Sequence, residues 1–298
     1  MTSLLLTPDQ ISSYERDGYL VIERFWDSSI VAELKCASDE LLSSFVPPAS
    51  GMSVFSTSEQ TRTSDEYFLS SGDQVRFFFE PAALDKSGAL VGPKETAVNK
   101  IGHALHEQHP LFRAHSLDCP RVAAIVRGSL KYTQPLVPQS MLICKPALIG
   151  GAVLPHVDGA FLYTKPQTCV GLWWPLEDCT LENGCLWAVP GSHLRQGGEV
   201  ARRFMRCAEG GGTTFEPLDA NTANLDTTGA VPLLIPAGSL VILHHNLVHF
   251  SHANTSQGSR FAYSIHIVEG AAEWVHDNWL QRDSPFPELQ KMPLTVVE

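Results

Sequence analysis

Two short segments of the chain bring metal-binding side chain types close together. The first is His156-Val157-Asp158. Residues i and i+2 of an extended segment project to the same face, so the His156 imidazole and the Asp158 carboxylate would converge on one point. The second segment, His244–His249, holds three more histidines after an apolar run. One of these with His156 and Asp158 would form the two-His-one-carboxylate set that binds non-haem Fe(II) and leaves adjacent positions open, whereas zinc takes a more closed set.

A cation follows this segment at a spacing that suits a bound dicarboxylate. Arg260 lies 11 residues after His249 and begins the alternating run Arg260–His266. If the two strands are neighbours, the Arg260 side chain points into the same cavity as the metal. A guanidinium there would hold one end of a dicarboxylate through two hydrogen bonds while the other end reaches the metal. The alternative, an arginine on the surface of a strand, agrees less well with this spacing.

The other histidines show no comparable pattern. His103, His106 and His109 recur at every third position of a segment that we expect to be helical, but they lack the glutamate of a zinc-protease helix. We expect solvated or capping roles for these three. No ligand pattern is visible for four others, for which we expect structural roles: His115, His193, His266 and His276.

Helix signals precede strand signals along the chain. Thr7-Pro8-Asp9-Gln10 combines a capping hydroxyl, an early proline and a glutamine, which predicts a helix that ends at Asp17-Gly18. A second helix is expected after Asp27-Ser28, and a longer helical stretch from about Glu95 to Leu130. Strand-like runs cover residues 19–22, 75–80, 139–144, 169–176, 185–189, 239–248 and 261–268. This order predicts a mainly β protein with flanking helices and a double-stranded β-helix core, the jelly roll of cupin-like proteins.

We expect a single domain, residues 1–298, with a helix-rich part of about 1–135 and a jelly-roll part of about 136–270. Neither an internal repeat nor a low-complexity linker divides the sequence. Two segments are candidates for a lid over a binding site: residues 46–74, rich in Ser, Thr and Pro, and residues 194–230, in which Gly210-Gly211-Gly212 would act as a hinge.

The composition restricts the partners and the compartment. The 298 residues include 21 Lys and Arg against 32 Asp and Glu, a formal net charge of −11. Such a surface lacks the counterion release that drives binding to nucleic acid or anionic membranes, so we expect a small-molecule partner and neither of those two. The seven cysteines include no CxxC pair, which is typical of reduced thiols. We see no signal peptide, no span of about 20 apolar residues and no Ser-Lys-Leu ending, and we therefore expect a cytoplasmic protein. The sequence leaves its oligomeric state open.

Several motifs together resemble the phytanoyl-CoA dioxygenase family of Fe(II)/2-oxoglutarate-dependent oxygenases. They extend over nearly the whole chain, and Asn-Gly followed by Pro-Gly-Ser-His is far more specific than the metal motif alone. The matching segments are Asp17-Gly18-Tyr19, His156-x-Asp158, Glu182–Leu186, Pro190–His193, Val248-His249 and Arg260. One subgroup of the family is resembled further through Asp65–Asp73, Arg76–Glu80 and Asn99–His103.

The resemblance implies Fe(II), 2-oxoglutarate as co-substrate and O2 as the cofactors. It implies His156, Asp158 and His249 as the iron ligands, with no catalytic residue beyond them. Arg260 matches the arginine that pairs with the distal carboxylate of 2-oxoglutarate, and Ser251 matches its hydroxyl helper.

Three further residues fall where the family lines the co-substrate pocket, namely Lys100, Met141 and Trp173. Each has an alternative role. Met141 and Trp173 would also suit an ordinary core, and Lys100 a charged helix surface. Trp174 is the alternative to Trp173, because adjacent residues of a strand face opposite ways.

The expected function is that of an Fe(II)/2-oxoglutarate-dependent dioxygenase, an oxidoreductase. It would couple the oxidative decarboxylation of 2-oxoglutarate to succinate and CO2 with hydroxylation of an unactivated C–H bond on a small organic substrate. One alternative is a secondary-metabolite tailoring oxygenase that acts on an alkaloid, terpenoid or acyl-chain substrate by desaturation, epimerisation or ring formation. A second is a cupin-like metal-binding protein without turnover, against which the intact metal motif and Arg260 argue. The net charge of −11 argues weakly against a polyanionic CoA ester.

Overall fold

The computed structural model describes residues 4–47, 53–54, 66–198, 200–207, 211–216 and 225–291. Parts of the two segments considered as lids lie outside these ranges: residues 48–52 and 55–65 in the first, and 199, 208–210 and 217–224 in the second. The first glycine of the expected hinge, Gly210, is among them. Within the described ranges, no helix is both long and apolar enough to span a membrane.

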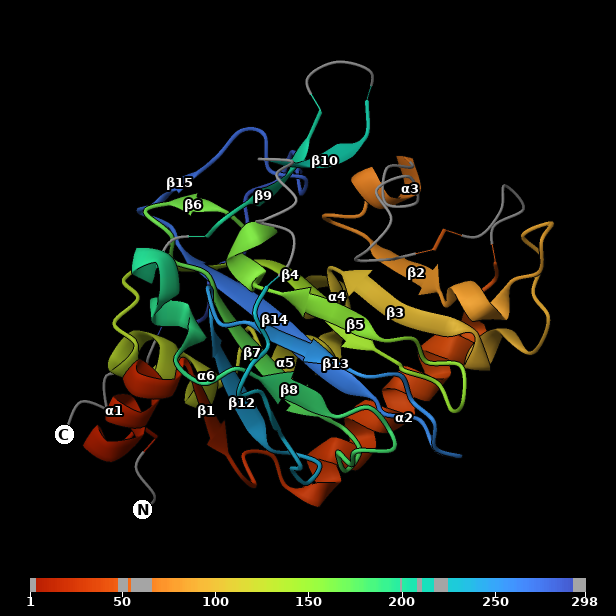
Figure 1. The fold of residues 1–298 in the computed structure, drawn as a ribbon, viewed down its shortest axis with the longest axis horizontal. Coiled ribbons are helices and arrows are strands. Elements are labelled where there is room, and N and C mark those ends of the chain that lie inside the picture. Colours follow the sequence, from red (N-terminus) through yellow and green to blue (C-terminus); the bar gives the residue numbers. More distant parts are fainter. Residues whose placement is uncertain are drawn as a thin grey trace.

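Two antiparallel sheets face each other at the centre of the described part of the chain (Figure 1). The larger has the strand order β1-β12-β7-β14-β4-β3-β2, and the smaller has the order β11-β8-β13-β5. This pairing of sheets confirms the predicted jelly-roll core with flanking helices. The strands of the larger sheet are β1 (Tyr19–Ile22), β2 (Val75–Phe79), β3 (Val98–His103), β4 (Pro135–Ile143), β7 (Val170–Pro175), β12 (Leu240–His244) and β14 (Ala262–Glu269). Those of the smaller sheet are β5 (Val153–His156), β8 (Leu186–Ala188), β11 (Val231–Pro232) and β13 (His249–Ser251).

Two short strand pairs lie outside these sheets. β6 (Thr164–Lys165) pairs with β15 (Glu273–Trp274), and β9 (Arg203–Arg206) forms a hairpin with β10 (Thr213–Glu216). Figure 1 shows the hairpin at the upper end of the sandwich, beside β6 and β15. It therefore lies at one end of the space between the sheets.

The helices are α1 (Pro8–Asp17), α2 (Ser28–Ser44), α3 (Glu66–Leu69), α4 (Leu105–Gln108), α5 (Pro110–His115) and α6 (Pro120–Ala123), which a π-helical turn, η4 (Ala124–Ser129), continues. Short 3-10 helices are η2 (Pro81–Ala83), η3 (Lys94–Thr96), η5 (Asp158–Ala160) and η6 (Ser192–Gly198). The predicted capping box of α1 is confirmed, since Thr7 and Gln10 bond each other's backbone N–H. The helix ends as predicted at Gly18, whose φ of +79° suits glycine.

The prediction of one helical stretch from Glu95 to Leu130 is wrong at its start. Residues Val98–His103 form β3, which pairs with β2 on one side and β4 on the other. These two ladders satisfy its backbone groups and bury Ile101 against the helices, so tertiary pairing outweighs the local helical pattern. Apart from the short 3-10 helix η3, helical structure in this stretch begins only at Leu105.

Alternation along the strands gives the larger sheet two different faces. On β14, Tyr263, Ile265 and Ile267 pack into the main hydrophobic core together with side chains of α2 and α5. Ser264 and His266 face the opposite way, toward the smaller sheet, where they line a cavity. Each large apolar side chain buried on the helix side contributes about 1.5–3 kcal/mol of transfer free energy, so this face stabilises the fold and leaves the other free for a polar site.

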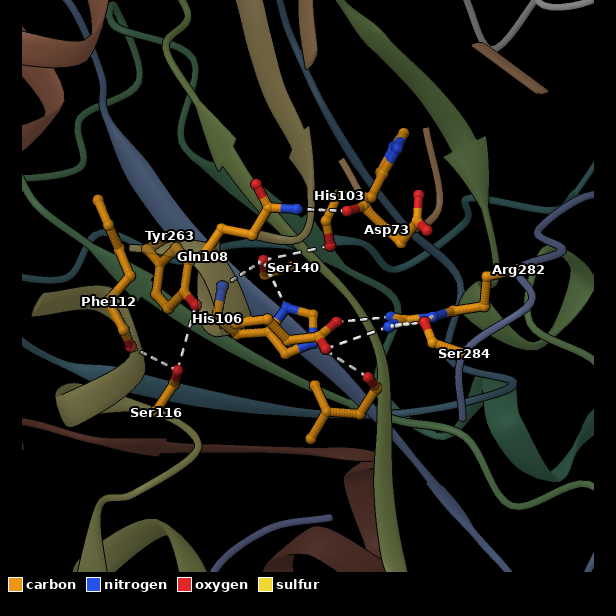
Figure 2. A network of polar contacts seen from close by, with 12 residues as sticks. Asp73, His103, His106, Gln108, Phe112, Ser116, Ser140, Tyr263, Arg282 and Ser284 are labelled. Carbon is orange, nitrogen blue, oxygen red and sulfur yellow. Dashed lines mark hydrogen bonds and ion pairs between the residues drawn. The ribbon is translucent and has the colours of Figure 1, made fainter. Parts of the chain in front are cut away.

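A network of polar contacts connects the helices to the back of the larger sheet (Figure 2). His106 of α4 lies with Nδ1 2.9 Å from Ser140 Oγ on β4 and with Nε2 3.1 Å from the Val137 carbonyl. Ser116, after α5, lies 3.2 Å from the Tyr263 hydroxyl on β14 (Figure 2). Burial lowers the pKa of His106 to about 4, so the imidazole is neutral and serves as a fixed hydrogen-bonding group.

The expected solvated or capping role is therefore wrong for His106, and it is also wrong for His103. His103 is buried on β3 and its Nδ1 lies 2.8 Å from the Ser71 hydroxyl. The sequence pattern misled because the three histidines do not share one helix: His103 ends a strand and His106 lies in a separate short helix. His109 stands between α4 and α5 at a capping position, but its side chain makes no capping hydrogen bond there.

Candidate active site

Three metal-binding side chains converge where two strands of the smaller sheet meet. His156 ends β5 and lies directly opposite His249, which begins β13, and Asp158 opens η5 two residues later. The Nε2 atoms of His156 and His249 lie 3.8 and 3.6 Å from Asp158 Oδ1. One donor atom from each residue lies within 4.8 Å of the others, a spacing that suits a shared ion. Two imidazoles and one carboxylate are the donor set of open Fe(II) sites.

The tautomers of both histidines suit metal binding. His156 Nδ1 lies 2.9 Å from the Leu154 carbonyl, and His249 Nδ1 lies 3.0 Å from the Leu247 carbonyl. Because a carbonyl only accepts, each Nδ1 carries the hydrogen and each Nε2 keeps its lone pair for a metal. Burial and the neighbouring His249 lower the pKa of His156 to about 3, so its imidazole is neutral at physiological pH.

A fourth residue, His266, orients the carboxylate from behind. Its Nε2 lies 3.2 Å from Asp158 Oδ2, and its Nδ1 lies 3.2 Å from the side-chain nitrogen of Gln139. The amide donates to Nδ1, so Nε2 carries the hydrogen that faces the carboxylate. Burial alone would raise the pKa of Asp158, but the surrounding histidines hold it below its usual range.

The sequence signal for His266 was present but weak. Ala262, Ser264 and His266 alternate along β14, and Arg260 continues the same alternation just before the strand, so the sequence places the four on one face. Once Arg260 is expected in the cavity, His266 is expected there too. The expected structural role of His266 is thus that of a residue which orients Asp158 from the lining of the cavity.

Arg260 is buried with most of its hydrogen-bonding capacity unused. It is 2% exposed, and its Nη2 donates to the Gly184 carbonyl at 3.1 Å. Its Nε and Nη1 have no hydrogen-bond partner among the described residues. Burial lowers the pKa of Arg260 from its ordinary value, but an arginine keeps its charge in proteins. Buried donors without a partner are costly, so the geometry fits a carboxylate ligand with two oxygens.

The metal-binding cluster and Arg260 open into one cavity of about 690 Å³ between the two sheets. The cavity is also lined by the other residues that the family resemblance implies for the co-substrate, namely Lys100, Met141, Trp173 and Ser251. The Trp173 ring lies 5.5 Å from the Arg260 guanidinium carbon. Trp174 faces the opposite side of the sheet and stacks on Trp26 at 4.7 Å, so Trp173 is the tryptophan at the cavity.

The structure also shows which histidine of residues 244–249 lies with His156 and Asp158. His249 joins the metal-binding cluster. His244 lies at the end of β12, against His193 and Tyr14.

Sequence reasoning missed a second buried cation at this end of the cavity, Lys145. Its Nζ donates to the Gly151 carbonyl at 2.7 Å and to Ser251 Oγ at 3.1 Å. The Ser251 oxygen thus accepts from Lys145, which leaves the hydroxyl hydrogen available for a ligand. Burial and the nearby Arg260 lower the pKa of Lys145 to about 7. No pattern in the sequence marks this lysine, because it lies in the turn after β4, where its φ is +33°.

The two most specific sequence motifs support these residues from outside the cavity. In the Asn183-Gly184 motif, the Gly184 carbonyl holds Arg260, and a side chain on Gly184 would come within 2.3 Å of Lys145 Cε. In the Pro190–His193 motif, Ser192 Oγ accepts a hydrogen bond from the backbone N–H of Val248, next to His249. The motifs therefore position the metal-binding and cation residues.

Comparison with known proteins identifies the family of the chain. Residues 14–262 match the family described as phytanoyl-CoA dioxygenase (PhyH). A phytanoyl-CoA dioxygenase of Arabidopsis thaliana is 44% identical over 289 residues, which cover 97% of this chain and 98% of the relative. The chain belongs to the phytanoyl-CoA dioxygenase family. Within this family, phytanoyl-CoA dioxygenase domain-containing protein 1 of Mus musculus is 43% identical over 300 residues, covering 97% and 98%, in line with the subgroup that the sequence resembles.

Solved structures support the fold of this family member. EctD from S. alaskensis with bound Fe has a TM-score of 0.63 at 19% identity and covers 98% of this chain and 90% of its own. The non-heme alpha ketoglutarate dependent carbocyclase SnoK from nogalamycin biosynthesis has a TM-score of 0.62 at 21% identity, with coverage of 96% and 94%. At these identities the likeness concerns the jelly-roll fold.

Membership of the phytanoyl-CoA dioxygenase family makes the chain an oxidoreductase, an Fe(II)/2-oxoglutarate-dependent oxygenase that also uses O2. The residues fit these groups on structural grounds, since the cluster offers neutral Nε2 atoms and a carboxylate, and Arg260 offers unbonded donors. The alternative of a metal-binding protein without turnover is set aside.

Proposed function

We propose that this oxygenase hydroxylates an unactivated C–H bond of a small organic substrate, with His156, Asp158 and His249 as the iron ligands. Arg260 and Ser251 bind the distal carboxylate of 2-oxoglutarate. Lys100, Met141 and Trp173 line the co-substrate pocket. We further propose that residues 1–298 act as one domain, because β1, β2 and β3 complete the larger sheet. A cytoplasmic location is proposed on the basis of the seven free cysteines.

The observation that carries this proposal is a pair of donors on Arg260, Nε and Nη1, that no described residue accepts from. They face the same cavity as the metal-binding cluster, from the same end as Ser251. An anion with two carboxylate ends would reach both. Two buried cations, Arg260 and Lys145, repel each other until such an anion is bound.

Iron, 2-oxoglutarate and O2 would together supply the oxidative chemistry, in which O2 is the oxidant and succinate and CO2 are the co-products. The chain supplies binding and orientation. His156 and His249 present fixed Nε2 lone pairs, and His266 holds Asp158 so that Oδ1 faces them. The apolar walls of the cavity, Trp173 and Met141 among them, exclude water from the reacting groups.

Lys100 has a less direct role in this scheme. Its Nζ lies 3.9 Å from Met141 Sδ, and burial lowers its pKa to about 7, opposed in part by Glu80. A positive charge on Lys100 attracts the anionic co-substrate at longer range. The paired hydrogen bonds to its carboxylate come from the guanidinium of Arg260.

The proposal is tested by anaerobic titration of the protein with Fe(II) and 2-oxoglutarate. The wild type should develop a weak metal-to-ligand absorption band, and His156→Ala should abolish it. Arg260→Ala should raise the 2-oxoglutarate concentration needed for the band while Fe(II) binding persists. The exposed Arg195→Ala serves as the control for loss of an arginine. Equal loss of iron and 2-oxoglutarate binding in Arg260→Ala would contradict the roles proposed here.

The type of oxidation is read from the products. Incubation of the active enzyme with a metabolite extract should yield a product with one additional oxygen atom. Loss of two hydrogens without gain of oxygen would point to desaturation or ring formation, and unchanged mass with inverted stereochemistry to epimerisation.

A further inference from the structure

The cavity extends from the metal-binding cluster along a wall of three aromatic rings, Phe161, Phe204 and Phe215. Phe161 follows η5 and meets His156 edge-on, with ring centroids 5.9 Å apart. Phe204 of β9 and Phe215 of β10 are paired across the hairpin and lie 5.4 and 5.7 Å from Phe161. All three rings line the cavity. The aromatic wall thus begins at a proposed iron ligand and ends on the β9–β10 hairpin.

The hairpin is fixed to the body of the protein by two of its arginines. Arg203 pairs with Asp277 at 2.7 Å, and Arg206 donates to the carbonyl groups of Trp279 and Leu69 at 2.8 and 2.6 Å. Trp279 stacks on Phe68 at 4.4 Å, and both rings also line the cavity. The aromatic end of the cavity is therefore enclosed by rings from several elements in a fixed arrangement.

A third arginine of this region, Arg202, packs on an aromatic ring of the wall. Its guanidinium carbon lies 4.0 Å from the centre of the Phe215 ring, and the side chain is partly buried in the lining of the cavity. Within the described ranges, it has neither an ion pair nor a hydrogen bond, in contrast to Arg203 and Arg206. Burial lowers the pKa of Arg202, yet the guanidinium keeps its charge, and none of its donors is bonded to a residue that the structure describes.

The other charged groups of the cavity lie elsewhere. Arg260 and Lys145 occupy the co-substrate end. Glu80 accepts a hydrogen bond from Asn99 at 2.7 Å and offsets the charge of Lys100 on β3. The volume of about 690 Å³ must hold 2-oxoglutarate as well as the substrate, and it lies within the usual range for drug-sized ligands.

We propose that the primary substrate is a small molecule with an apolar, ring-sized body and one anionic group, and that Arg202 binds this anion. The inference rests on the proposed function. The body packs on the aromatic wall, which brings its C–H bonds next to His156, and the anion pairs with the guanidinium at the far end of the wall. A carboxylate and a phosphate ester both fit a guanidinium fork, so the shared chemistry is that of a monoanionic or dianionic oxyacid. Arg202 is thereby a specificity-determining residue.

The test uses four probes that share one body: phenylbutyrate, phenylbutyl phosphate, phenylbutanol and phenylbutylamine. Their dissociation constants are measured by calorimetry, without oxygen, on enzyme saturated with Fe(II) and 2-oxoglutarate. Saturation keeps the anionic probes from the Arg260 end. The variants are Arg202→Gln, Arg202→Glu and, as a control on a paired arginine, Arg195→Gln.

The wild type should bind one of the two anionic probes about tenfold more tightly than the alcohol, as expected for a partly desolvated charge-assisted hydrogen bond. The better of the two distinguishes a carboxylate from a phosphate substrate. In Arg202→Gln, the dissociation constants of the anionic probes and of the alcohol should differ by no more than about twofold. Arg202→Glu should bind the amine more tightly than the other probes. A reversal of this kind does not arise from general damage to the fold.

Three results with the wild type would overturn the inference: equal binding of anion and alcohol, tighter binding of the amine, or binding of none of the probes. Survival of the anion preference in Arg202→Gln would do so as well. In each case, Fe(II)- and 2-oxoglutarate-dependent succinate formation is measured on the same samples. If succinate is formed, only the substrate class is wrong; if it is not, the proposed function has failed.

Discussion

At the scale of single residues, the co-substrate end of the cavity is an electropositive site built from two buried cations of different kinds. Arg260 is held by a backbone carbonyl and has two donor atoms without a partner in the described part of the chain, whereas Lys145 is held by Gly151 and Ser251. A buried cation opposes folding unless it is compensated, so such residues are expected where a ligand supplies the compensation.

Lys145→Met tests this trade-off between stability and binding. The methionine keeps the length of the side chain in the space left by Gly150 and Gly184 but removes the buried ammonium group. The 2-oxoglutarate dissociation constant should rise about tenfold, the loss of one charge-assisted contact, while the melting temperature stays unchanged or rises. Calorimetry and thermal unfolding measure the two quantities.

The exposed Lys86→Met is the control for this variant and should change neither quantity. A clear drop in melting temperature together with unchanged affinity would mean that Lys145 is structural only.

The affinity for 2-oxoglutarate should fall as the pH rises through about 7. Lys145 faces Arg260, Glu80 and Cys185, and burial lowers its pKa to about 7, from an ordinary value of 10.5. The bound 2-oxoglutarate dianion favours the protonated form of Lys145. Above the pKa of Lys145, binding of 2-oxoglutarate must therefore be accompanied by uptake of a proton. This lowers the affinity for 2-oxoglutarate by up to about tenfold per pH unit. Lys100 titrates in the same range. Titrations of Mn(II)-loaded enzyme from about pH 6 to 8.5 should therefore show a slope that Lys145→Met reduces; an equal slope in both proteins would refute this role.

His266 should matter for metal affinity although it is not itself in the metal-binding cluster. His266→Ala removes the group that holds Asp158 Oδ2, and outer partners of this kind are worth about 10–100-fold in metal affinity. Equilibrium binding of Mn(II) measures the effect, with the exposed His276→Ala as the control. Unchanged Mn(II) affinity in a folded His266→Ala protein would show that the metal site does not depend on this contact.

At the scale of elements, turns and motif loops outside the cavity determine the geometry inside it. Gly184 has a φ of +74°, and a Cβ there would lie 2.3 Å from Lys145 Cε and 2.5 Å from the His252 carbonyl. The same residue anchors Arg260 through its own carbonyl. One loop position therefore affects both cations.

Gly184→Ala should weaken 2-oxoglutarate binding at the co-substrate end, an effect that backbone strain alone does not produce. Gly229 is the matched control, since its φ of +82° is equally left-handed but its surroundings are open. Gly229→Ala should cost only the left-handed strain, about 1–2 kcal/mol of unfolding free energy, and leave 2-oxoglutarate binding intact. Gly184→Ala should additionally weaken 2-oxoglutarate binding by about tenfold or more. Urea unfolding and calorimetry give both values, and equal affinities in the two variants would contradict the proposed function of this loop.

Much of the site followed from strand alternation in the sequence, and the failures follow from its limits. The spacing of His156 and Asp158 and the position of Arg260 indicated one cavity because residues two apart share a face. Alternation does not say which face of a strand lines the cavity, so the sequence alone does not decide between Trp173 and Trp174. In the structure, Trp174 lies on the face of the larger sheet that the helices cover, and Trp173 lies on the other face. Lys145 lies in a turn, where no periodicity applies.

The N-terminal half was harder to predict for a related reason. β3 is a strand because β2 and β4 flank it, and these contacts come from segments distant in sequence. Local patterns do not contain that information, so a helix was expected there. By contrast, the caps of α1 are encoded by neighbouring residues and were predicted correctly.

At the scale of the whole molecule, the charge distribution separates into an acidic protein and a basic centre. The chain has a net charge of −11, yet Arg260, Lys145 and Lys100 all line its cavity. The jelly roll makes this possible, because the space between its two sheets is shielded from the surface charges.

The most direct test of the central claim is succinate formation by Fe(II)-loaded enzyme supplied with 2-oxoglutarate and O2. Wild-type protein should form succinate and CO2 in equal amounts and should require both Fe(II) and O2. His156→Ala should reduce formation to the level of protein without iron, and the exposed His276→Ala should not. Absence of succinate from the wild type, or undiminished formation by His156→Ala, would contradict the assignment of this site as the Fe(II)/2-oxoglutarate centre.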